Sequence, residues 1–200
     1  MNGGTSHDAG VKVSQPGVVG ANDLVIVGPG VLGRMVAETC SSSFLFTSST
    51  AAYDCSDNGF CNEDSPIVPI GTNPRTDVLL KAENTTLEAG GCIPRLAGLY
   101  KADRGAHVYW LKKGSVNAHP DHILNLIHYE EAASLLITVM QNKFRGRIFL
   151  GCDNHPLSRQ EIIDFLNQSG QFNKKLQGFT GTDGPLGKRM DNSKTLRQTD

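Results

Sequence analysis

A glycine-rich turn follows the first apolar run of this chain. Gly28, Gly30 and Gly33 have the G-x-G-x-x-G spacing directly after the apolar residues 24–27. Between a strand and a helix, such glycines permit a tight turn, let a pyrophosphate approach the backbone, and let the helix pack closely on the strand. We therefore expect a strand, a phosphate-binding turn and a helix, with a dinucleotide as the ligand. The residues expected to bind it are Gly28, Gly30, Val31, Leu32 and Gly33.

The residue that usually holds the adenosine ribose is not found where the pattern requires it. An acidic side chain is expected about 20 positions after the glycines, at the end of a second strand. Here the apolar and hydroxyl-bearing run 44–50 occupies that place, and no carboxylate follows until Asp54. The sequence therefore predicts a phosphate cradle without its ribose carboxylate, and no residue indicates whether the cofactor is NAD or NADP.

Composition narrows the possible partners. The chain has 19 Lys and Arg against 20 Asp and Glu, so no net field attracts nucleic acid or an anionic membrane. We expect a small-molecule substrate and neither nucleic acid nor membrane as a partner. The sequence does not indicate which substrate is bound or how many subunits associate. The 5 cysteines form no C-x-x-C pair, which favours a reducing compartment. No targeting signal is legible, so we expect the cytoplasm or an organellar stroma.

Strand-like and helix-like segments alternate along the middle of the chain. Strand-like runs lie at 43–49, 92–97 and 147–150, and helical patterns lie between them. Such alternation predicts an α/β fold with a parallel, open, Rossmann-like sheet. The expected organisation is a disordered segment 1–23, an incomplete NAD(P)-binding domain 24–172, and a polar, partly disordered tail 173–200.

Three helix starts and stops can be read from the sequence. Thr76 is expected to cap a helix that runs through Ala89. Acidic residues 130 and 131 favour a second helix start. Ser158 and Glu161 form a capping box that opens a third helix, with Ile162, Phe165 and Leu166 inward and Gly170 at its end.

Four further motifs, in order, resemble a known enzyme family. Segments 46–53, 81–83, 93–100 and 125–133 are similar to the second half of the NAD-dependent epimerases and dehydratases, in the extended and atypical short-chain dehydrogenase/reductase group. The resemblance runs from about Asp23 to Lys194. It implies action on sugar-nucleotide-type or similar small substrates, with Ser49 and Lys81 in the catalytic site. In this family the lysine holds the nicotinamide ribose and lowers the pKa of a tyrosine that moves a proton.

The tyrosine of that catalytic set is replaced. Asp77 stands four residues before Lys81, where the family has the tyrosine. A carboxyl group titrates near 4 and a phenol near 10, so Asp77 does not match the weak acid that a carbonyl reduction needs. Tyr53 is a candidate substitute acid, and an aromatic residue lining the loop is the alternative.

The resemblance also implies a missing part. Between the first helix and the strand that carries Ser49, the family has its second to fourth strands, whereas here residues 39–43 make the connection. The sequence therefore looks like an internally shortened and C-terminally truncated member. Strand 24–27 would then pair with strand 43–49 in a four-stranded sheet. Three alternatives remain. The chain is an NAD(P)-binding protein of doubtful activity, a non-catalytic nucleotide-binding or regulatory module, or a poorly folded shortened isoform.

Histidines offer two further candidates. His119 and His122 have a spacing that suits metal chelation, but no third ligand is placed near them, so we expect no metal site. His128 precedes an acidic helix start and is expected to be a packed, hydrogen-bonded residue. Trp110 lies in the region where the family contacts substrate, with burial in the core as the alternative.

Overall fold

A three-stranded parallel sheet lies at the centre of the protein. The computed structural model describes residues 44–173 and 178–199, and the sheet has the order β1-β3-β8. β1 (Ser48–Ser49) pairs with β3 (Ile93–Leu96), which pairs along its length with β8 (Ile148–Gly151). All four residues of β3 are buried, as expected of a central strand covered on both faces. Each of the three strand-like runs therefore contributes one of these neighbouring strands, and the expected strand 24–27 lies outside the described residues.

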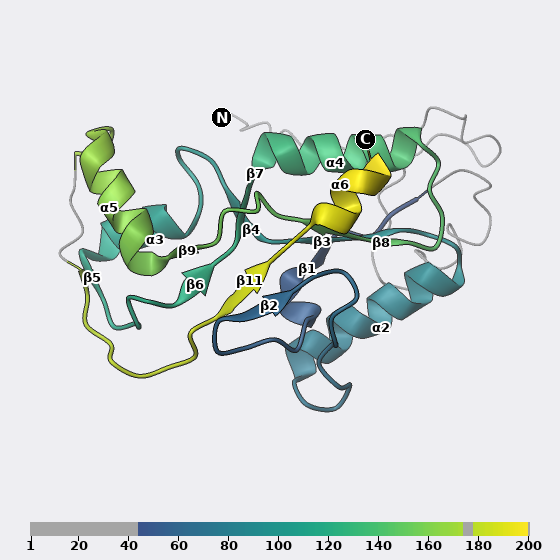
Figure 1. The fold of residues 1–200 in the computed structure, drawn as a ribbon, viewed down its shortest axis with the longest axis horizontal. Coiled ribbons are helices and arrows are strands. Elements are labelled where there is room, and N and C mark those ends of the chain that lie inside the picture. The colour runs from purple at the N-terminus through teal and green to yellow at the C-terminus, as the bar shows by residue number, and fades with distance from the viewer. Residues whose placement is uncertain (1–43, 174–177, 200) are drawn as a thin grey trace, which may run out of the picture.

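Helices cover both faces of this sheet. α2 (Pro74–Glu88) lies along one face and α4 (Tyr129–Gln141) along the other (Figure 1). Val139 of α4 packs with Leu45 and Phe149 in one cluster of the core. Because the three strands are parallel, their carboxyl ends lie at one edge of the sheet. Open α/β sheets bind ligands at this edge.

The start of α2 differs from the prediction. Asn73 caps this helix by accepting a hydrogen bond from the Arg75 amide at 2.9 Å, and Pro74 occupies the first helical position. Thr76 is a buried residue of the first turn, so its prediction as the cap is wrong. Both residue types cap helices well, and the proline decides the position because its ring fits the first turn.

Side-chain caps fix the starts of the next two long helices. His128 caps α4 and Ser158 caps α5 (Arg159–Ser169), each in a capping box. Gly170 ends α5 with φ +65°, the left-handed conformation that glycine adopts readily. The capping box and the terminal glycine are confirmed. Phe165 is not inward as predicted, because it is 56% exposed while Ile163 takes the inner face.

A second cluster of apolar residues lies at the other end of the molecule. Trp110 of α3 (Ala106–Lys113) is buried there beside Ile162 and Ile163. The indole packs edge-on against Phe179, with ring centroids 5.1 Å apart. Trp110 is therefore a core residue. The short strands around this cluster are β4 (Gly98–Tyr100) paired with β7 (Leu126–His128), β5 (Ser115–Val116) with β10 (Gly178–Phe179), and β6 (Ile123–Leu124) with β9 (Leu157–Ser158).

A two-stranded ribbon joins distant parts of the chain. β2 (Gly59–Cys61) pairs in parallel with β11 (Lys188–Met190), and the two lie side by side in front of the sheet (Figure 1). α6 (Ser193–Thr199) follows and packs near α4. Met190 and Thr195 are buried, which the polar composition of residues 173–200 did not lead us to expect. Within the described ranges, no helix has the length and apolar character needed to cross a membrane.

Candidate functional site

Ser49 lies at the carboxyl end of β1, at the edge of the central sheet. It is also the N-cap of a single helical turn, η1 (Thr50–Ala52), where its Oγ accepts a hydrogen bond from the Ala51 amide at 3.2 Å. The residue is partly buried. The hydroxyl is thus held at the sheet edge by the backbone turn that follows it.

The other end of the same turn is held by Lys188. Its ammonium donates hydrogen bonds to the carbonyl of Thr50 at 3.0 Å and to that of Tyr53 at 2.7 Å. A positive charge at the carbonyl end of a helical turn is favourable. Burial lowers the pKa of Lys188. Sequence reasoning missed this residue because it lies 135 positions from Tyr53, and no local pattern signals the contact.

Tyr53 is part of the core. It is only 2% exposed, and the guanidinium carbon of Arg95 lies 4.6 Å from the centre of its ring. Among the described residues its hydroxyl has no hydrogen-bond partner. Burial raises its pKa to about 12, although the charge of Arg95 acts in the opposite direction. Among the described residues, the phenol is thus enclosed in the core.

A buried ion pair lies next to this tyrosine. Arg95 of β3 donates to both carboxylate oxygens of Glu83 on α2, with Nη2 to Oε2 at 2.6 Å. Ser48 donates its hydroxyl proton to the same carboxylate. The network ties α2 to the two strands that it covers, so the neighbour of Ser49 is fixed from the helix side.

Asp77 and Lys81 share one side of α2, since they are four residues apart in a helix. The Asp77 carboxylate accepts a hydrogen bond from the Gly71 amide at 2.9 Å and so holds the preceding loop. Lys81 is exposed. The structure therefore places a loop-bound carboxylate, rather than a phenol, one helical turn before the lysine.

The predicted cofactor turn lies outside the described residues. This applies to Gly28, Gly30, Val31, Leu32 and Gly33. Ser49, Lys81 and Tyr53 lie on or beside elements that pack together, since α2 packs against β1 and η1. Among the described residues, the expected site is therefore formed by the end of β1 and by α2.

The histidines have structural contacts. His128 Nδ1 accepts a hydrogen bond from the Glu130 amide at 3.3 Å and its ring packs edge-on against Tyr100. This confirms the packed, hydrogen-bonded role. His119 Nδ1 accepts from the Asp121 amide at 3.1 Å, and His122 Nδ1 lies 2.5 Å from the Pro185 carbonyl. Each ring thus has one nitrogen engaged by a different backbone group.

Comparison with solved structures identifies the architecture. A functionally unknown conserved protein from Silicibacter pomeroyi superposes with a TM-score of 0.70 at 23% identity, over 84% of this chain and 64% of that one. The fold is Rossmann-like. No protein-family model matches, and no curated protein does.

Other proteins with this Rossmann-like fold were solved with NAD. UDP-glucuronic acid 4-epimerase from Bacillus cereus, in complex with UDP-glucuronic acid and NAD, gives a TM-score of 0.67 at 14% identity. dTDP-glucose 4,6-dehydratase from Bacillus anthracis, in complex with NAD, gives 0.67 at 12%. The matches cover 84% of this chain and 59% and 60% of those chains. This chain therefore spans about three-fifths of the length of the structures that it resembles.

Proposed function

We propose that this chain binds NAD or NADP weakly and does not carry out the standard oxidoreductase chemistry of sugar-nucleotide epimerases and dehydratases. Three features support binding: the glycine spacing in the sequence, Ser49 at the carboxyl edge of the sheet, and the exposed Lys81 on α2. When bound, the nicotinamide would accept or donate a hydride. The residues that would hold the cofactor are the glycine turn and Lys81.

One observation carries the second half of the proposal. The position of the catalytic phenol is occupied by Asp77, whose carboxylate is hydrogen-bonded to the Gly71 amide. Tyr53 does not replace it, because its hydroxyl is buried beside Arg95 and its pKa is raised to about 12. The Asp77 carboxylate is thus engaged by the loop, and the buried phenol of Tyr53 is not an acid poised near neutral pH. A non-catalytic nucleotide-binding or regulatory module fits these residues better than an active enzyme.

The missing ribose carboxylate supports weak binding. A charge-assisted hydrogen bond contributes about 1.5 to 3 kcal/mol, so its loss lowers affinity roughly 10- to 100-fold. The internal shortening inferred from residues 39–43 would remove the adenine pocket as well. We therefore expect a dissociation constant for NADH above about 10 µM.

Titration of the full chain with NADH and NADPH, followed by nicotinamide fluorescence, tests the binding. Lys81→Met is expected to weaken binding about tenfold, the loss of roughly 1.4 kcal/mol. Lys112→Met is the matched control, since this lysine is exposed on α3 at the other end of the molecule. Absence of any saturable signal in a cooperatively folded protein would refute cofactor binding.

Turnover is measured separately. Epimerisation is assayed with UDP-glucuronic acid and dehydration with dTDP-glucose, the sugar nucleotides named with the structural neighbours. No turnover is expected from the natural chain. Turnover that persists in Asp77→Asn but is abolished by Tyr53→Phe would show that Tyr53 is the acid after all and would overturn the proposal.

A further inference from the structure

The β2–β11 ribbon has two faces with different surroundings. Consecutive side chains of a strand point to opposite sides. Lys188 points to η1 and donates to the carbonyls of Thr50 and Tyr53. Arg189, the next residue, borders a cavity of about 660 Å³ instead. This cavity is therefore separate from the sheet edge that carries Ser49.

The cavity is lined by donors and acceptors in close alternation. Arg189 supplies a guanidinium, and Glu161, at the start of α5, supplies a carboxylate. The Ser158 amide donates to Glu161 Oε2 at 2.7 Å and holds the pKa of that carboxyl below its usual value, so the group is ionised. Within the described part of the chain, Arg189 and Glu161 are not an ion pair. Both therefore keep hydrogen-bonding capacity for a ligand.

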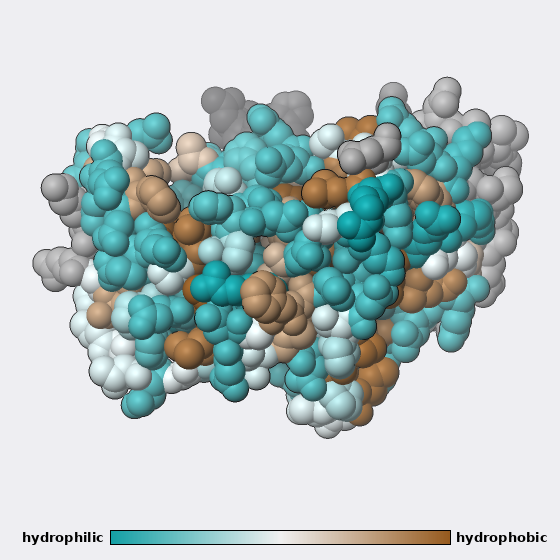
Figure 2. Space-filling model, in the orientation of Figure 1, coloured by the Kyte–Doolittle hydropathy of each residue, from teal (hydrophilic) through white to brown (hydrophobic). Residues whose placement is uncertain are grey.

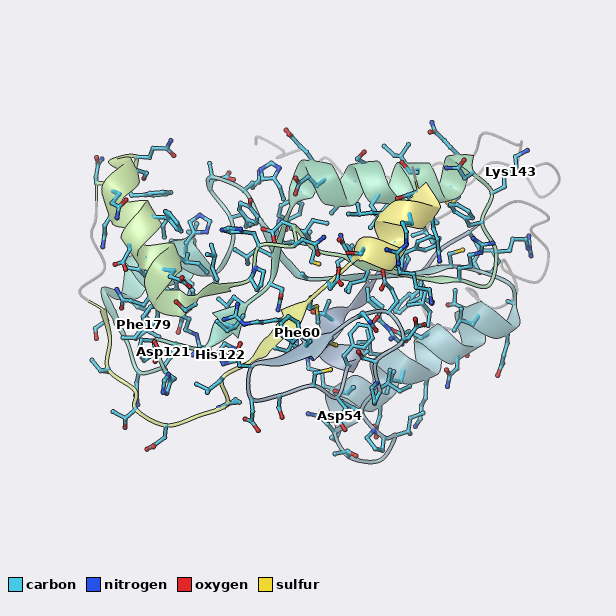
Figure 3. All side chains as sticks on the ribbon, in the orientation of Figure 1. Asp54, Phe60, Asp121, His122, Lys143 and Phe179 are labelled. Atoms are coloured by element: carbon cyan, nitrogen blue, oxygen red, sulfur yellow. The ribbon has the colours of Figure 1, made fainter. Side chains whose placement is uncertain are left out.

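Two more polar groups come from the turn before β6. His119 Nδ1 accepts from the Asp121 amide, so the neutral ring carries its proton on Nε2 as a donor. The Asp121 carboxylate is exposed, and Figure 3 shows it beside His122 in this turn. Ile123 and Leu186 add apolar surface. The lining thus combines hydrogen-bond donors, two carboxylates and an apolar part.

This arrangement selects against strongly charged ligands. A phosphate facing Arg189 also faces the negative charges of Glu161 and Asp121, and an ammonium facing those carboxylates also faces Arg189. A hydroxyl group matches both, because it donates to a carboxylate and accepts from a guanidinium. A compact molecule with several hydroxyls therefore fits this lining best.

An exposed aromatic residue shares a face of the ribbon with Arg189, next to the residues that line the cavity but not one of them. Phe60 is 83% exposed and is the register partner of Arg189, so the two side chains leave the ribbon on the same face. Figure 3 labels Phe60, and Figure 2, drawn in the same orientation, shows apolar surface at that place among hydrophilic residues. Asn58, two residues earlier, lines the cavity. A flat apolar ring beside alternating polar groups suits a ligand with one apolar and one hydroxylated face.

We propose that this cavity binds an uncharged pyranose sugar, which packs the C–H face of its ring on Phe60 and bridges Arg189 to Glu161 and Asp121 with its hydroxyls. The inference does not rest on cofactor binding at the Ser49 edge. A single sugar ring on an open surface forms few contacts, so we expect a dissociation constant of about 1 mM.

The experiment is a titration of the full chain by saturation-transfer NMR with methyl glucoside, methyl galactoside and maltose, compared with glucose 1-phosphate and glucosamine. Saturable binding of at least one neutral sugar is expected, with weaker binding of the charged pair. Phe60→Ala and Arg189→Met are each expected to reduce affinity about tenfold. Phe165→Ala is the control, because this exposed phenylalanine lies on α5 and not on the β2–β11 ribbon that carries Phe60 and Arg189.

Three outcomes overturn the proposal. The first is that no neutral sugar saturates the protein up to about 100 mM. The second is that glucose 1-phosphate or glucosamine binds more tightly than every neutral sugar. The third is that Phe60→Ala and Arg189→Met both leave binding unchanged. Circular dichroism melts of each variant check that the fold is retained. Since Phe60 and Arg189 are at the surface or partly exposed, we expect those melts to match the natural protein.

Discussion

Arg95 and Glu83 form an ion pair that is almost completely buried, with the two groups 2.6 Å apart at Nη2 and Oε2. Its Arg95 end stacks on Tyr53, and its Glu83 end accepts from Ser48, the residue before Ser49. The candidate site is thus built directly on a buried charge pair, whose desolvation cost is offset by the several hydrogen bonds to the carboxylate.

Breaking this pair should destabilise the fold strongly. Glu83→Gln leaves the buried guanidinium without a counter-charge, and we expect a loss of about 3 to 5 kcal/mol in the free energy of unfolding by urea. Glu88→Gln, at an exposed position of the same helix, should change it by less than about 0.5 kcal/mol. The double variant Glu83→Leu with Arg95→Met should recover part of the loss. Equal stability of Glu83→Gln and Glu88→Gln would contradict the assignment.

Tyr53 should make stability depend on alkaline pH. Its pKa is raised to about 12, above the ordinary value of 10.0, so the folded state holds the proton more tightly than the unfolded state. The free energy of unfolding should therefore not depend on this proton below pH 10. It should fall as the pH rises toward 12, by up to about 1.4 kcal/mol per pH unit. The measurement is urea unfolding at several pH values, as the difference between the natural protein and Tyr53→Phe.

At neutral pH the same substitution should do little harm. The hydroxyl of Tyr53 makes no hydrogen bond of good geometry among the described residues, although Arg95 lies beside it, so Tyr53→Phe should change the free energy of unfolding by less than about 1 kcal/mol. A pH profile of Tyr53→Phe that coincides with that of the natural protein would show that the phenol titrates normally.

Lys188 should determine the order of the turn after Ser49. Lys188→Met removes two hydrogen bonds from a charged donor, and we expect a loss of about 1.5 to 3 kcal/mol together with faster hydrogen exchange at the amides of 51–53. Lys194→Met is the control, because Lys194 pairs with Asp64 at the surface, where an ion pair contributes less than about 1 kcal/mol. Unchanged exchange at 51–53 would rule out the capping role.

Thr195 should be as important as a core residue. It is 2% exposed, donates to Glu63 Oε1 through its amide at 2.7 Å and its hydroxyl at 2.6 Å, and accepts from the Leu150 amide. Thr195→Val leaves the Leu150 amide and part of the Glu63 carboxylate unsatisfied, which should cost about 2 to 4 kcal/mol in thermal or urea unfolding. Thr199→Val, in the same helix, removes a bond within the helix alone and should cost less than about 1 kcal/mol.

Much of the central fold could be predicted from local pattern. Residues 92–97 form a strand-like run bounded by glycines, and Ser158 with Glu161 marks a helix start within four residues. Both features depend on neighbours in the sequence, so they can be read without a structure. Thr76 was misassigned because two good caps compete within four residues and the proline favours Asn73.

The contacts that complete the candidate site could not be predicted. Lys188 reaches Tyr53 across 135 residues, and Glu63 reaches Thr195 across 132. Each lies in a polar segment whose composition resembles a solvated surface, and only the pairing of β2 with β11 brings them inward. Local periodicity carries no information about such pairing, so the interior role of residues 188–195 had no signal.

The parallel pairing of β2 with β11 also sets a time order for assembly. During synthesis, Ser49 leaves the ribosome long before Lys188, since chain growth proceeds at about 5 to 20 residues per second. Until then the carbonyls of Thr50 and Tyr53 lack the ammonium that binds both of them. The sheet edge therefore takes its final form only after Lys188 has been made, although its own residues are among the first described ones to be made.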